Sequence, residues 1–436
     1  MNKPRKTWLT AFGTAAAGIA GLLLPVFGPA GGAEAAQAAV TGIHVANGRV
    51  YEANGNEFVM RGVNHAHAWY PERTGSIADI AAKGANTVRV VLASGDRWAP
   101  TSQADVSSLI GQCKANKVIC VLEVHDTTGY GEDGAATSLD RAADYWISIK
   151  GALAGQEDYV VVNIGNEPFG NNGYSAWTNA TKSAIGKLRG AGIDHALMVD
   201  APNWGQDWSQ TMRSNAASVF ASDPDRNTIF SIHMYGVYDT AAEVQDYLNH
   251  FVGNGLPIVV GEFGDAHSDG NPDENAIMAT AQSLRVGYIG WSWSGNGSGV
   301  EYLDLVNGFD ANSLTSWGNR FFNGANGISS TSRTATVYGD GGDGETGGGT
   351  APNGYPYCVN GGATDPDGDG WGWESSRSCV VRGSSADTGS GGGGTGGTAP
   401  NGYPYCVNGS ATDPDGDGWG WESSRSCVVR GSSADR

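Results

Sequence analysis

Two glutamates follow apolar segments of the chain in settings that suit acid–base and nucleophilic chemistry. Glu167 lies in an Asn-Glu-Pro triplet just after the apolar run 159–166, and Glu262 lies near the end of the run 257–263. A retaining glycosidase uses such a pair about 5–5.5 Å apart: one carboxylic acid protonates the leaving oxygen, and the other carboxylate attacks the sugar. We therefore predict that Glu167 is the acid/base and Glu262 the nucleophile of a retaining glycosidase.

Other polar side chains end apolar segments in the same way, and five of them are predicted to support the two glutamates: Arg89, His125, Asn166, His233 and Tyr235. Burying so many polar groups costs free energy unless they pair with one another. Arg89, His233 and Tyr235 could keep the nucleophile ionised, and Asn166 suits a hydrogen bond to the sugar 2-hydroxyl. A structural salt bridge is the alternative for Arg89, and a core histidine for His125. Glu123 shares a strand face with His125 and would support it.

The apolar segments alternate with helical patterns. Eight runs are predicted as strands: 58–65, 86–92, 118–125, 159–166, 196–200, 228–235, 257–263 and 288–293. Six helices are predicted between them, at Ser76–Ala82, Val106–Ala115, Leu139–Leu153, Tyr174–Leu188, Ala241–Val252 and Glu274–Leu284, whereas 204–226 has no clear pattern. This order predicts the α/β class and a (β/α)8 TIM barrel, whose active site lies at the C-terminal ends of the strands. A doubly wound open sheet is the alternative, but no Gly-x-Gly-x-x-Gly follows the first strand.

Composition divides the chain into six parts. They are a secretion signal at 1–38, a catalytic barrel at 39–338, linkers at 339–349 and 388–397, and two small binding modules at 350–387 and 398–436. The basic start, the apolar run and Ala-Gln-Ala at 36–38 predict export, cleavage and a secreted, extracellular protein. A membrane anchor is the alternative, which the glycines and prolines in the run disfavour. Ahead of the first barrel strand, Asn47-Gly48 and Asn54-Gly55 predict a hairpin.

The six cysteines fall into three local pairs: Cys113 with Cys120, Cys358 with Cys379, and Cys406 with Cys427. In an exported protein such pairs indicate disulfides. For Cys113 and Cys120, free buried thiols are the alternative. A zinc site is disfavoured, because the chain has no Cys-x-x-Cys and no histidine near the four C-terminal cysteines.

The net charge of −19, from 45 acidic and 26 basic residues, bears on the partners of the chain. It argues against nucleic acid and anionic membranes as partners, because both favour clusters of Lys and Arg. A neutral polysaccharide is compatible with it, and we expect a monomer. The chemistry requires no cofactor. A structural calcium ion could bind four acidic residues that follow the nucleophile, with a solvated acidic loop as the alternative: Asp265, Asp269, Asp273 and Glu274.

The ordered motifs TVRVV, LEVHD, NIGNEP, SIHMYG, VVGEFG and GWSWSGN, over about 42–335, resemble glycoside hydrolase family 5. The segments RGVNHAHAWY and VHDTTGYGED resemble its bacterial β-mannanase subgroup. The resemblance implies endo-hydrolysis of β-1,4-mannosidic bonds in mannan, glucomannan or galactomannan, and sugar contacts from His67, Trp69, Trp204 and Trp291. A cellulase is the alternative, and a non-catalytic wall-binding protein a third possibility. Trp204 could also simply cap the barrel.

The two terminal units repeat one another, because Thr350–Asp387 and Thr398–Asp435 differ only at Gly362 and Ser410. The motifs YPYCV, GWGWE and SCVV resemble carbohydrate-binding module family 10, although each unit has two cysteines where the family often has four. The resemblance implies binding to cellulose or a related polysaccharide. A unit this small can hardly bury all its large aromatics, so some of them are predicted to form an exposed platform for the polysaccharide; the candidates are Tyr355, Tyr357, Trp371, Trp373, Tyr403, Tyr405, Trp419 and Trp421. The alternative is that these aromatics form the small core of each unit.

Overall fold

The computed structural model describes residues 42–297 and 299–339, and shorter stretches of the two repeats between 355 and 435. The predicted secretion signal and almost all of both predicted linkers lie outside the described residues. Within the described residues, no helix has the length and apolar character needed to cross a membrane.

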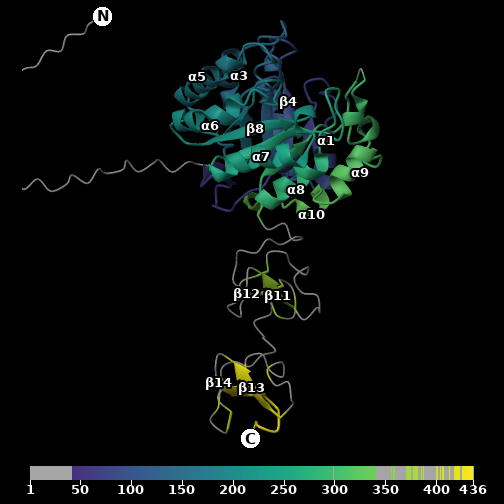
Figure 1. Ribbon diagram of the computed structural model, residues 1–436. Helices are drawn as coiled ribbons and strands as arrows, with labels where there is room; N and C mark the ends of the chain where they lie inside the picture. The colour runs from purple at the N-terminus through teal and green to yellow at the C-terminus, as the bar shows by residue number, and fades with distance from the viewer. Residues whose placement is uncertain are drawn as a thin grey trace, which may run out of the picture. The chain divides into compact units, whose positions relative to one another are not determined.

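Eight parallel strands close into a barrel in the order β10-β3-β4-β5-β6-β7-β8-β9, with helices packed around them (Figure 1). Their bounds are β3 (Arg61–His65), β4 (Thr87–Leu92), β5 (Ile119–Val124), β6 (Val160–Asn163), β7 (Leu197–Asp200), β8 (Thr228–Met234), β9 (Ile258–Phe263) and β10 (Gly287–Gly290). Each of the eight overlaps its predicted run, which confirms the (β/α)8 barrel. Every residue of these strands is buried, as expected for a parallel sheet covered by helices.

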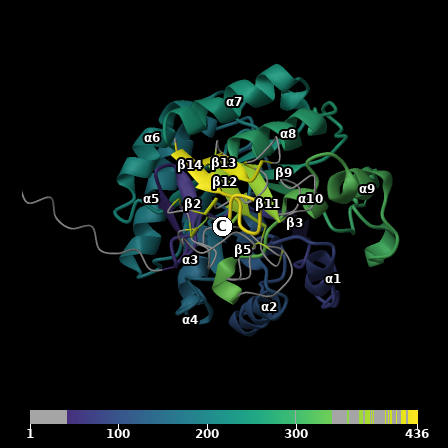
Figure 2. The ribbon, with the colours of Figure 1, turned by 90° about the horizontal axis from the view of Figure 1, so that it is seen from below.

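The helices form a ring around the strands (Figure 2). They are α1 (Ser76–Ala82), α2 (Gln103–Ala115), α3 (Leu139–Ser148), α4 (Lys150–Leu153), α5 (Trp177–Gly190), α6 (Thr211–Ser222), α7 (Ala241–Gly253), α8 (Glu274–Leu284), α9 (Ser316–Asn323) and α10 (Ile328–Thr331). The predicted helix at 139–153 is divided at Ile149 into α3 and α4. Helix α6 lies in the connection for which the sequence showed no clear helical pattern. The pattern was weak because only three of the twelve residues of α6 are buried, so its apolar face is narrow.

The side chains inside the barrel change from apolar to polar along the strands. On β5, Ile119 and Val121 belong to an inner apolar cluster, whereas Cys120 and Leu122 face the helices. The next inward position toward the C-terminal end is Glu123, which is fully buried. The same change from apolar to polar occurs on two further strands: Val161 to Asn163 on β6, and Met198 to Asp200 on β7. Polar chemistry is therefore concentrated at the C-terminal ends of the strands.

A hairpin precedes the barrel, as predicted. Strands β1 (His44–Ala46) and β2 (Arg49–Tyr51) pair antiparallel around Asn47 and Gly48, whose φ angles are 50° and 70°. Positive φ at both turn residues is what a two-residue hairpin with Asn-Gly requires. The adjoining residues Ile43, Phe58 and Met60 close the apolar end of the barrel.

The predicted disulfide between Cys113 and Cys120 is wrong for this structure. Cys113 lies near the end of α2 and Cys120 on β5, and both are buried free thiols. The two side chains share a hydrogen bond, and burial raises the pKa of the Cys120 thiol well above its ordinary value. The apolar interior of the barrel wall therefore keeps Cys120 as a neutral thiol.

Each repeat contains a short hairpin, labelled in Figure 1, and one disulfide. In the first, β11 (Trp371–Glu374) pairs with β12 (Arg377–Val380), and Cys358 is bonded to Cys379. In the second, β13 (Trp419–Glu422) pairs with β14 (Arg425–Val428), and Cys406 is bonded to Cys427. These two predicted disulfides and the small β-rich modules are confirmed.

Candidate active site

The two predicted catalytic carboxylates meet at the C-terminal end of the barrel. Glu167 follows β6, and Glu262 lies on β9. One carboxylate oxygen of each, together with a ring nitrogen of His233, all lie within 4.8 Å of one another. Glu167 has a φ of 39°, a backbone conformation that residues with a Cβ rarely adopt. Strain of this kind recurs at functional sites, where surrounding contacts hold it in place.

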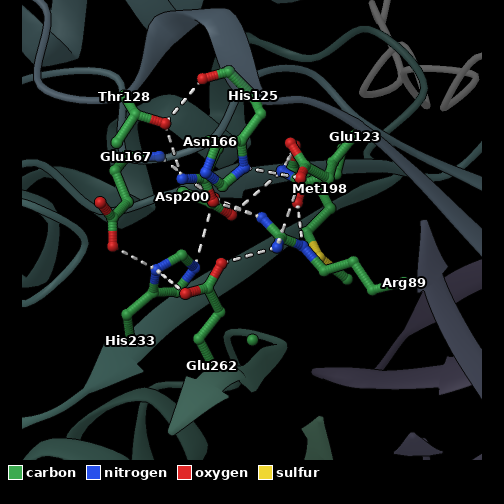
Figure 3. A network of polar contacts seen from close by, with 12 residues as sticks. Arg89, Glu123, His125, Thr128, Asn166, Glu167, Met198, Asp200, His233 and Glu262 are labelled. Carbon is green, nitrogen blue, oxygen red and sulfur yellow. Dashed lines mark hydrogen bonds and ion pairs between the residues drawn. The ribbon is translucent and has the colours of Figure 1, made fainter. Parts of the chain in front are cut away.

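His233 bridges the two glutamates (Figure 3). Its Nδ1 lies 2.8 Å from Glu167 Oε1 and 3.5 Å from Glu262 Oε2, and its Nε2 lies 3.3 Å from Asp200 Oδ2. Burial alone lowers the pKa of His233, but the charges of Glu262 and Asp200 outweigh burial and raise the pKa to about 10. The ring is therefore a cation at neutral pH that donates to Glu167. A protonated imidazole has no lone pair for a metal ion, so this cluster is an ion-pair network.

Arg89 lies at the centre of the network and is fully buried. Its guanidinium contacts five side chains: Glu262 Oε1 at 2.8 Å, Asn64 Oδ1 at 2.9 Å, Asn163 Oδ1 at 2.8 Å, Asn166 Oδ1 at 2.7 Å and Asp200 Oδ2 at 3.1 Å. Burial lowers the pKa of Arg89, but the charges of Glu123, Asp200 and Glu262 raise it above its ordinary value. A buried guanidinium is tolerable only because its donors are paired in this way. Arg89 therefore fixes the position of Glu262 from inside the barrel.

Opposing effects act on the carboxyl of Glu262. Burial raises its pKa above the ordinary value, while the charges of His233 and Arg89 lower it. The Tyr235 hydroxyl donates to Oε2 at 3.1 Å, opposite the Arg89 contact on Oε1. Arg89 and His233 thus lower the pKa of Glu262 as predicted, and Tyr235 contacts its carboxylate as predicted, but the effect of burial on the pKa is larger.

His125 and Asn166 are each held by contacts with neighbouring side chains, and both also line the cleft. His125 Nδ1 lies 2.8 Å from Glu123 Oε1, and its ring stacks on Trp291 with centroids 5.7 Å apart. Burial lowers the pKa of His125, but Glu123 raises it overall. Asn166 accepts from Arg89, and its Nδ2 donates to Thr128 Oγ1 at 2.9 Å. Neither residue is merely a core residue, since both also line the cleft.

Two hollows adjoin at the catalytic carboxylates. The first hollow is lined by both glutamates and by Trp69, His125 and Trp291, among others. The second hollow is lined by Glu167 but not Glu262, and by a different set that includes Trp204, Gln206, Trp208 and Asp269. Glu167, Tyr235 and His267 line both hollows. The predicted sugar contacts Trp69, Trp204 and Trp291 therefore lie in the cleft.

His67 is placed differently from the other predicted sugar contacts. It is half-buried beside His65, with ring centroids 6.0 Å apart, and it lines neither hollow. Burial lowers the pKa of His67.

Several residues of the site escaped the sequence prediction. Asp200 ends β7 and contacts Arg89, His233 and the backbone N–H of Glu167. It is the last residue of a predicted strand, so the same inspection of strand ends could have found it. Asn64 and Asn163 carry no such signal, because buried amides are common in structural roles. Trp98 packs against Trp69 and His125, with centroids 5.3 and 5.7 Å apart.

The four acidic residues predicted as a weak calcium site have separate partners. Asp273 caps helix α8 by accepting from the Ala276 backbone N–H. Asp269 contacts Gln206 and His267. Glu274 lies 3.8 Å from Arg320, and the charge of Glu274 adds to burial in raising the pKa of Asp265. Within the described residues, the four do not form a group that could hold a metal ion.

The aromatics of the repeats divide between surface and core. Tyr403 and Trp419 are 47% and 36% exposed, with ring centroids 4.8 Å apart, and Tyr355 and Trp371 form the matching pair in the first repeat. Tyr357 packs on the small core of its repeat. In the second repeat, Tyr405 donates to Asp435 and lies under the Arg430 guanidinium. The side chains of Trp373 and Trp421 lie outside those that the structure describes.

A closed parallel barrel with two opposed glutamates at the C-terminal ends of its strands defines the class of a glycoside hydrolase. Residues 51–297 match the model of "Cellulase (glycosyl hydrolase family 5)", and the chain belongs to this family. Residues 348–381 and 395–429 match the model "Cellulose or protein binding domain", which confirms the resemblance of the two repeats.

The chain is similar to proteins named mannan endo-1,4-beta-mannosidase. The protein of Streptomyces lividans is 79% identical over 388 residues, which are 89% of this chain and 100% of the relative. The protein of Cellvibrio japonicus is 55% identical, covering 80% of this chain and 81% of the relative. The solved mannohexaose complex of the Thermomonospora fusca beta-mannanase is 59% identical, covers 69% of this chain and 100% of that chain, and has a TM-score of 0.67.

Proposed function

We propose that the chain is a secreted, retaining endo-β-1,4-mannanase that acts on mannan, glucomannan or galactomannan. The observation that carries this proposal is the pair of carboxylates within 4.8 Å, bridged by a protonated His233. The similarity to relatives and solved structures named as mannanases supports the substrate class.

In the first step, the Glu262 carboxylate attacks the anomeric carbon and forms a glycosyl ester, while the glycosidic C–O bond breaks. Glu167 gives its proton to the leaving oxygen. The His233 cation, 2.8 Å from Glu167 Oε1, then stabilises the carboxylate that Glu167 becomes. Arg89 and Tyr235 hold one oxygen of Glu262 each and orient it for attack.

In the second step, Glu167 acts as a base and takes a proton from water, whose oxygen attacks the anomeric carbon. The ester bond breaks, and Glu262 is released as a carboxylate within reach of the Arg89 and His233 cations. The sugar keeps its original configuration after two inversions. Proton NMR of the first-formed anomer tests this route, and an inverted first product would refute it.

The substrate test compares reducing-sugar release from mannan and from carboxymethylcellulose. A β-glucanase is the second candidate, because a 54% identical protein of Caldicellulosiruptor saccharolyticus is named "Beta-mannanase/endoglucanase A". We expect faster release from mannan. Faster release from carboxymethylcellulose would contradict the mannanase proposal and favour the glucanase.

The repeats are proposed to hold the enzyme on cellulose or related wall polysaccharide. Tyr355, Tyr403 and Trp419 are exposed, whereas Trp371 is partly buried beside Tyr355, and the two pairs would contact the apolar faces of pyranose rings. Two linked sites can raise avidity by about 10²–10⁴. Replacing the tyrosine and tryptophan of both pairs by alanine should abolish cellulose pull-down while hydrolysis of short mannan oligosaccharides stays unchanged. Unchanged pull-down would refute these contacts.

Export is proposed from the sequence of residues 1–38. N-terminal sequencing of the protein recovered from culture medium should begin after Ala-Gln-Ala at 36–38. Retention of the intact N-terminus in cell membranes would contradict it.

A further inference from the structure

Asp200 ends β7 behind the two glutamates, in a place that the cleft does not reach. Its side chain is fully buried, and the residue lines neither hollow. Burial raises the pKa of Asp200, but the charges of His233 and Arg89 outweigh burial and lower the pKa to about 2. Asp200 is therefore an anion over the whole working range of pH. Any effect that it has on the reaction passes through the groups around it.

Three donors hold the Asp200 carboxylate in place. Arg89 Nη2 donates to Oδ2 at 3.1 Å, and Asn163 Nδ2 donates to the other oxygen, Oδ1, at 3.0 Å. The backbone N–H of Glu167 also donates to Oδ2, at 3.3 Å. These contacts fix the carboxylate beside the His233 ring, so its negative charge acts on that ring from one constant direction.

His233 connects Asp200 to the Glu167 carboxyl (Figure 3). Its Nε2 lies 3.3 Å from Asp200 Oδ2 as an ion pair, and its Nδ1, on the other side of the ring, lies 2.8 Å from Glu167 Oε1. Two glycines pack against the ring, since an added Cβ would lie 2.5 Å from Nδ1 at Gly205 and 3.3 Å from Nε2 at Gly261. The ring is therefore held with one nitrogen toward each carboxyl group.

The charges around His233 favour its cationic form. Burial lowers the pKa of His233, but the charges of Glu262, whose Oε2 lies 3.5 Å from Nδ1, and of Asp200 raise it to about 10. The Arg89 cation pairs with both of these carboxylates. Tyr235, on the same strand as His233, is neutral, because burial raises its pKa well above the ordinary value. A neutral imidazole has one donor and one acceptor nitrogen, whereas the cation donates from both.

The donor at Nδ1 determines which oxygen of Glu167 carries the catalytic proton. Oε1 accepts from the His233 cation, so the proton of the carboxylic acid lies on the other oxygen. Figure 3 shows that second oxygen pointing away from the ring. A neutral ring with its hydrogen on Nε2 would instead present a lone pair to Oε1. Glu167 would then give its proton to His233 rather than to the leaving oxygen.

We propose that Asp200 is a positioning residue for the acid step: it keeps the His233 ring a donor at both nitrogens and thereby places the Glu167 proton on the oxygen that serves the leaving group. This inference rests on the proposed glycosidase function and adds a residue that controls how the acid is presented. Its consequence is selective. Loss of the Asp200 charge should harm substrates whose leaving group requires a proton and spare those whose leaving group does not.

Nitrogen-15 NMR of the full-length enzyme, labelled at histidine, tests the first part of the proposal. The spectrum reports whether one or both nitrogens of a ring carry hydrogen, and His233→Gln identifies the signal. In the wild type both His233 nitrogens should be protonated at pH 8. In Asp200→Asn, which keeps an oxygen for Arg89 and removes the charge, the ring should lose its second hydrogen at a pH lower by about one unit or more.

Two substrates test the second part. At pH 8, Asp200→Asn should lower kcat/KM for mannohexaose by about ten- to a hundredfold, because its sugar leaving group requires the proton. The same variant should change kcat/KM for 2,4-dinitrophenyl β-mannobioside less than threefold, since dinitrophenolate leaves without protonation. Asp200→Glu, which restores the charge, should recover part of the loss. Added to His233→Gln, Asp200→Asn should cause no further loss on mannohexaose, because Asp200 acts through the ring.

Asp223→Asn is the matched control. Asp223 is also fully buried and accepts from one arginine, Arg189, at 2.9 and 3.0 Å, apart from the two glutamates. This variant should lose stability and keep both kcat/KM values and the His233 spectrum.

Three results would overturn the inference: a neutral His233 in the wild type at pH 8, an unchanged His233 titration in Asp200→Asn, or equal losses on the two substrates. The wild-type spectrum decides even if Asp200→Asn does not fold. Each of these results leaves the proposed function standing, because the spectrum requires no substrate. A wild-type enzyme that does not cleave mannohexaose would contradict the proposed function instead.

Discussion

Arg89 Nη1 donates to Glu262 Oε1 across 2.8 Å, from a strand that is not a neighbour of β9 in the barrel. The pair crosses the interior of the barrel, where Arg89 is wholly buried and Glu262 is 4% exposed. Its geometry depends on the whole barrel being closed, since β10 and β3 separate the two strands. The position of the nucleophile is thereby coupled to the stability of the fold.

Replacing Arg89 by methionine should harm both activity and stability. The change leaves buried carboxylates without their cation, which costs about 3–5 kcal/mol of unfolding free energy. Turnover should fall by roughly 10²–10³-fold, since Glu262 loses its orienting contact. Urea unfolding and initial rates measure the two effects.

Arg61→Met is the matched control, because Arg61 is also buried but donates to the Met60 and Val286 carbonyls, apart from the two glutamates. It should lose stability while the folded protein keeps its turnover rate. Equal turnover losses in the two variants would contradict the role given to Arg89.

His233 should make stability depend on alkaline pH. Its pKa is raised from 6.5 to about 10 in the folded protein, where burial opposes and the charges of Glu262 and Asp200 favour the cation. The stabilisation is therefore complete below pH 6.5 and is lost as the pH rises toward 10. The shift corresponds to at most about 5 kcal/mol.

Unfolding free energies of wild type and His233→Gln, measured between pH 6 and 10, test this dependence. The difference between the two proteins should shrink steadily as the pH rises. A difference that stays constant over this range would mean that His233 is neutral in the folded protein.

Gly205 should be required for the position of His233. Its φ is 72°, and a Cβ there would lie 2.5 Å from His233 Nδ1, the atom that contacts Glu167. Gly205→Ala should therefore lower turnover as well as stability. Gly192→Ala is the matched control, because Gly192 has a φ of 76° and no atom lies within 4 Å of the added Cβ. This variant should lose only about 1 kcal/mol of unfolding free energy, from backbone strain, and keep its turnover. Normal turnover in Gly205→Ala would contradict the tight contact with His233.

The thiols of Cys113 and Cys120 can be counted. Both are buried, so native protein without reductant should not react with a thiol reagent. Protein unfolded in denaturant should react with two equivalents, because the other four cysteines are disulfide-bonded. No reaction after unfolding would show that Cys113 and Cys120 form the disulfide that the sequence predicts.

The barrel and its two glutamates could be predicted because the strands are mostly apolar runs, and Glu167 and Glu262 lie just after or near the C-terminal end of two of them. Helix α6 could not, since its buried face consists of Met212, Ala216 and Val219 alone. The pairing at Cys113 and Cys120 could not either, because local spacing does not distinguish a hydrogen-bonded pair of thiols from a disulfide.

The network behind the glutamates was only partly predictable. Asp200 ends a strand and carried the same signal as Glu262. The roles of Asn64 and Asn163 become visible only in the folded structure, where their side-chain oxygens accept hydrogen bonds from Arg89. His267 follows its strand by several residues, in a loop whose path is set by the contact between Asp269 and Gly236. Such contacts between loops leave no periodic pattern in the sequence.

The assignment of Glu262 as the nucleophile can be tested by trapping the covalent intermediate. The enzyme is incubated with 2,4-dinitrophenyl 2-deoxy-2-fluoro-β-mannobioside, which forms the glycosyl ester quickly and releases it slowly, and its peptides are analysed by mass spectrometry. The account predicts one added fluoroglycosyl group, carried by the peptide that contains Glu262 and absent in Glu262→Gln. A label on another residue, or turnover without any labelled enzyme, would contradict it.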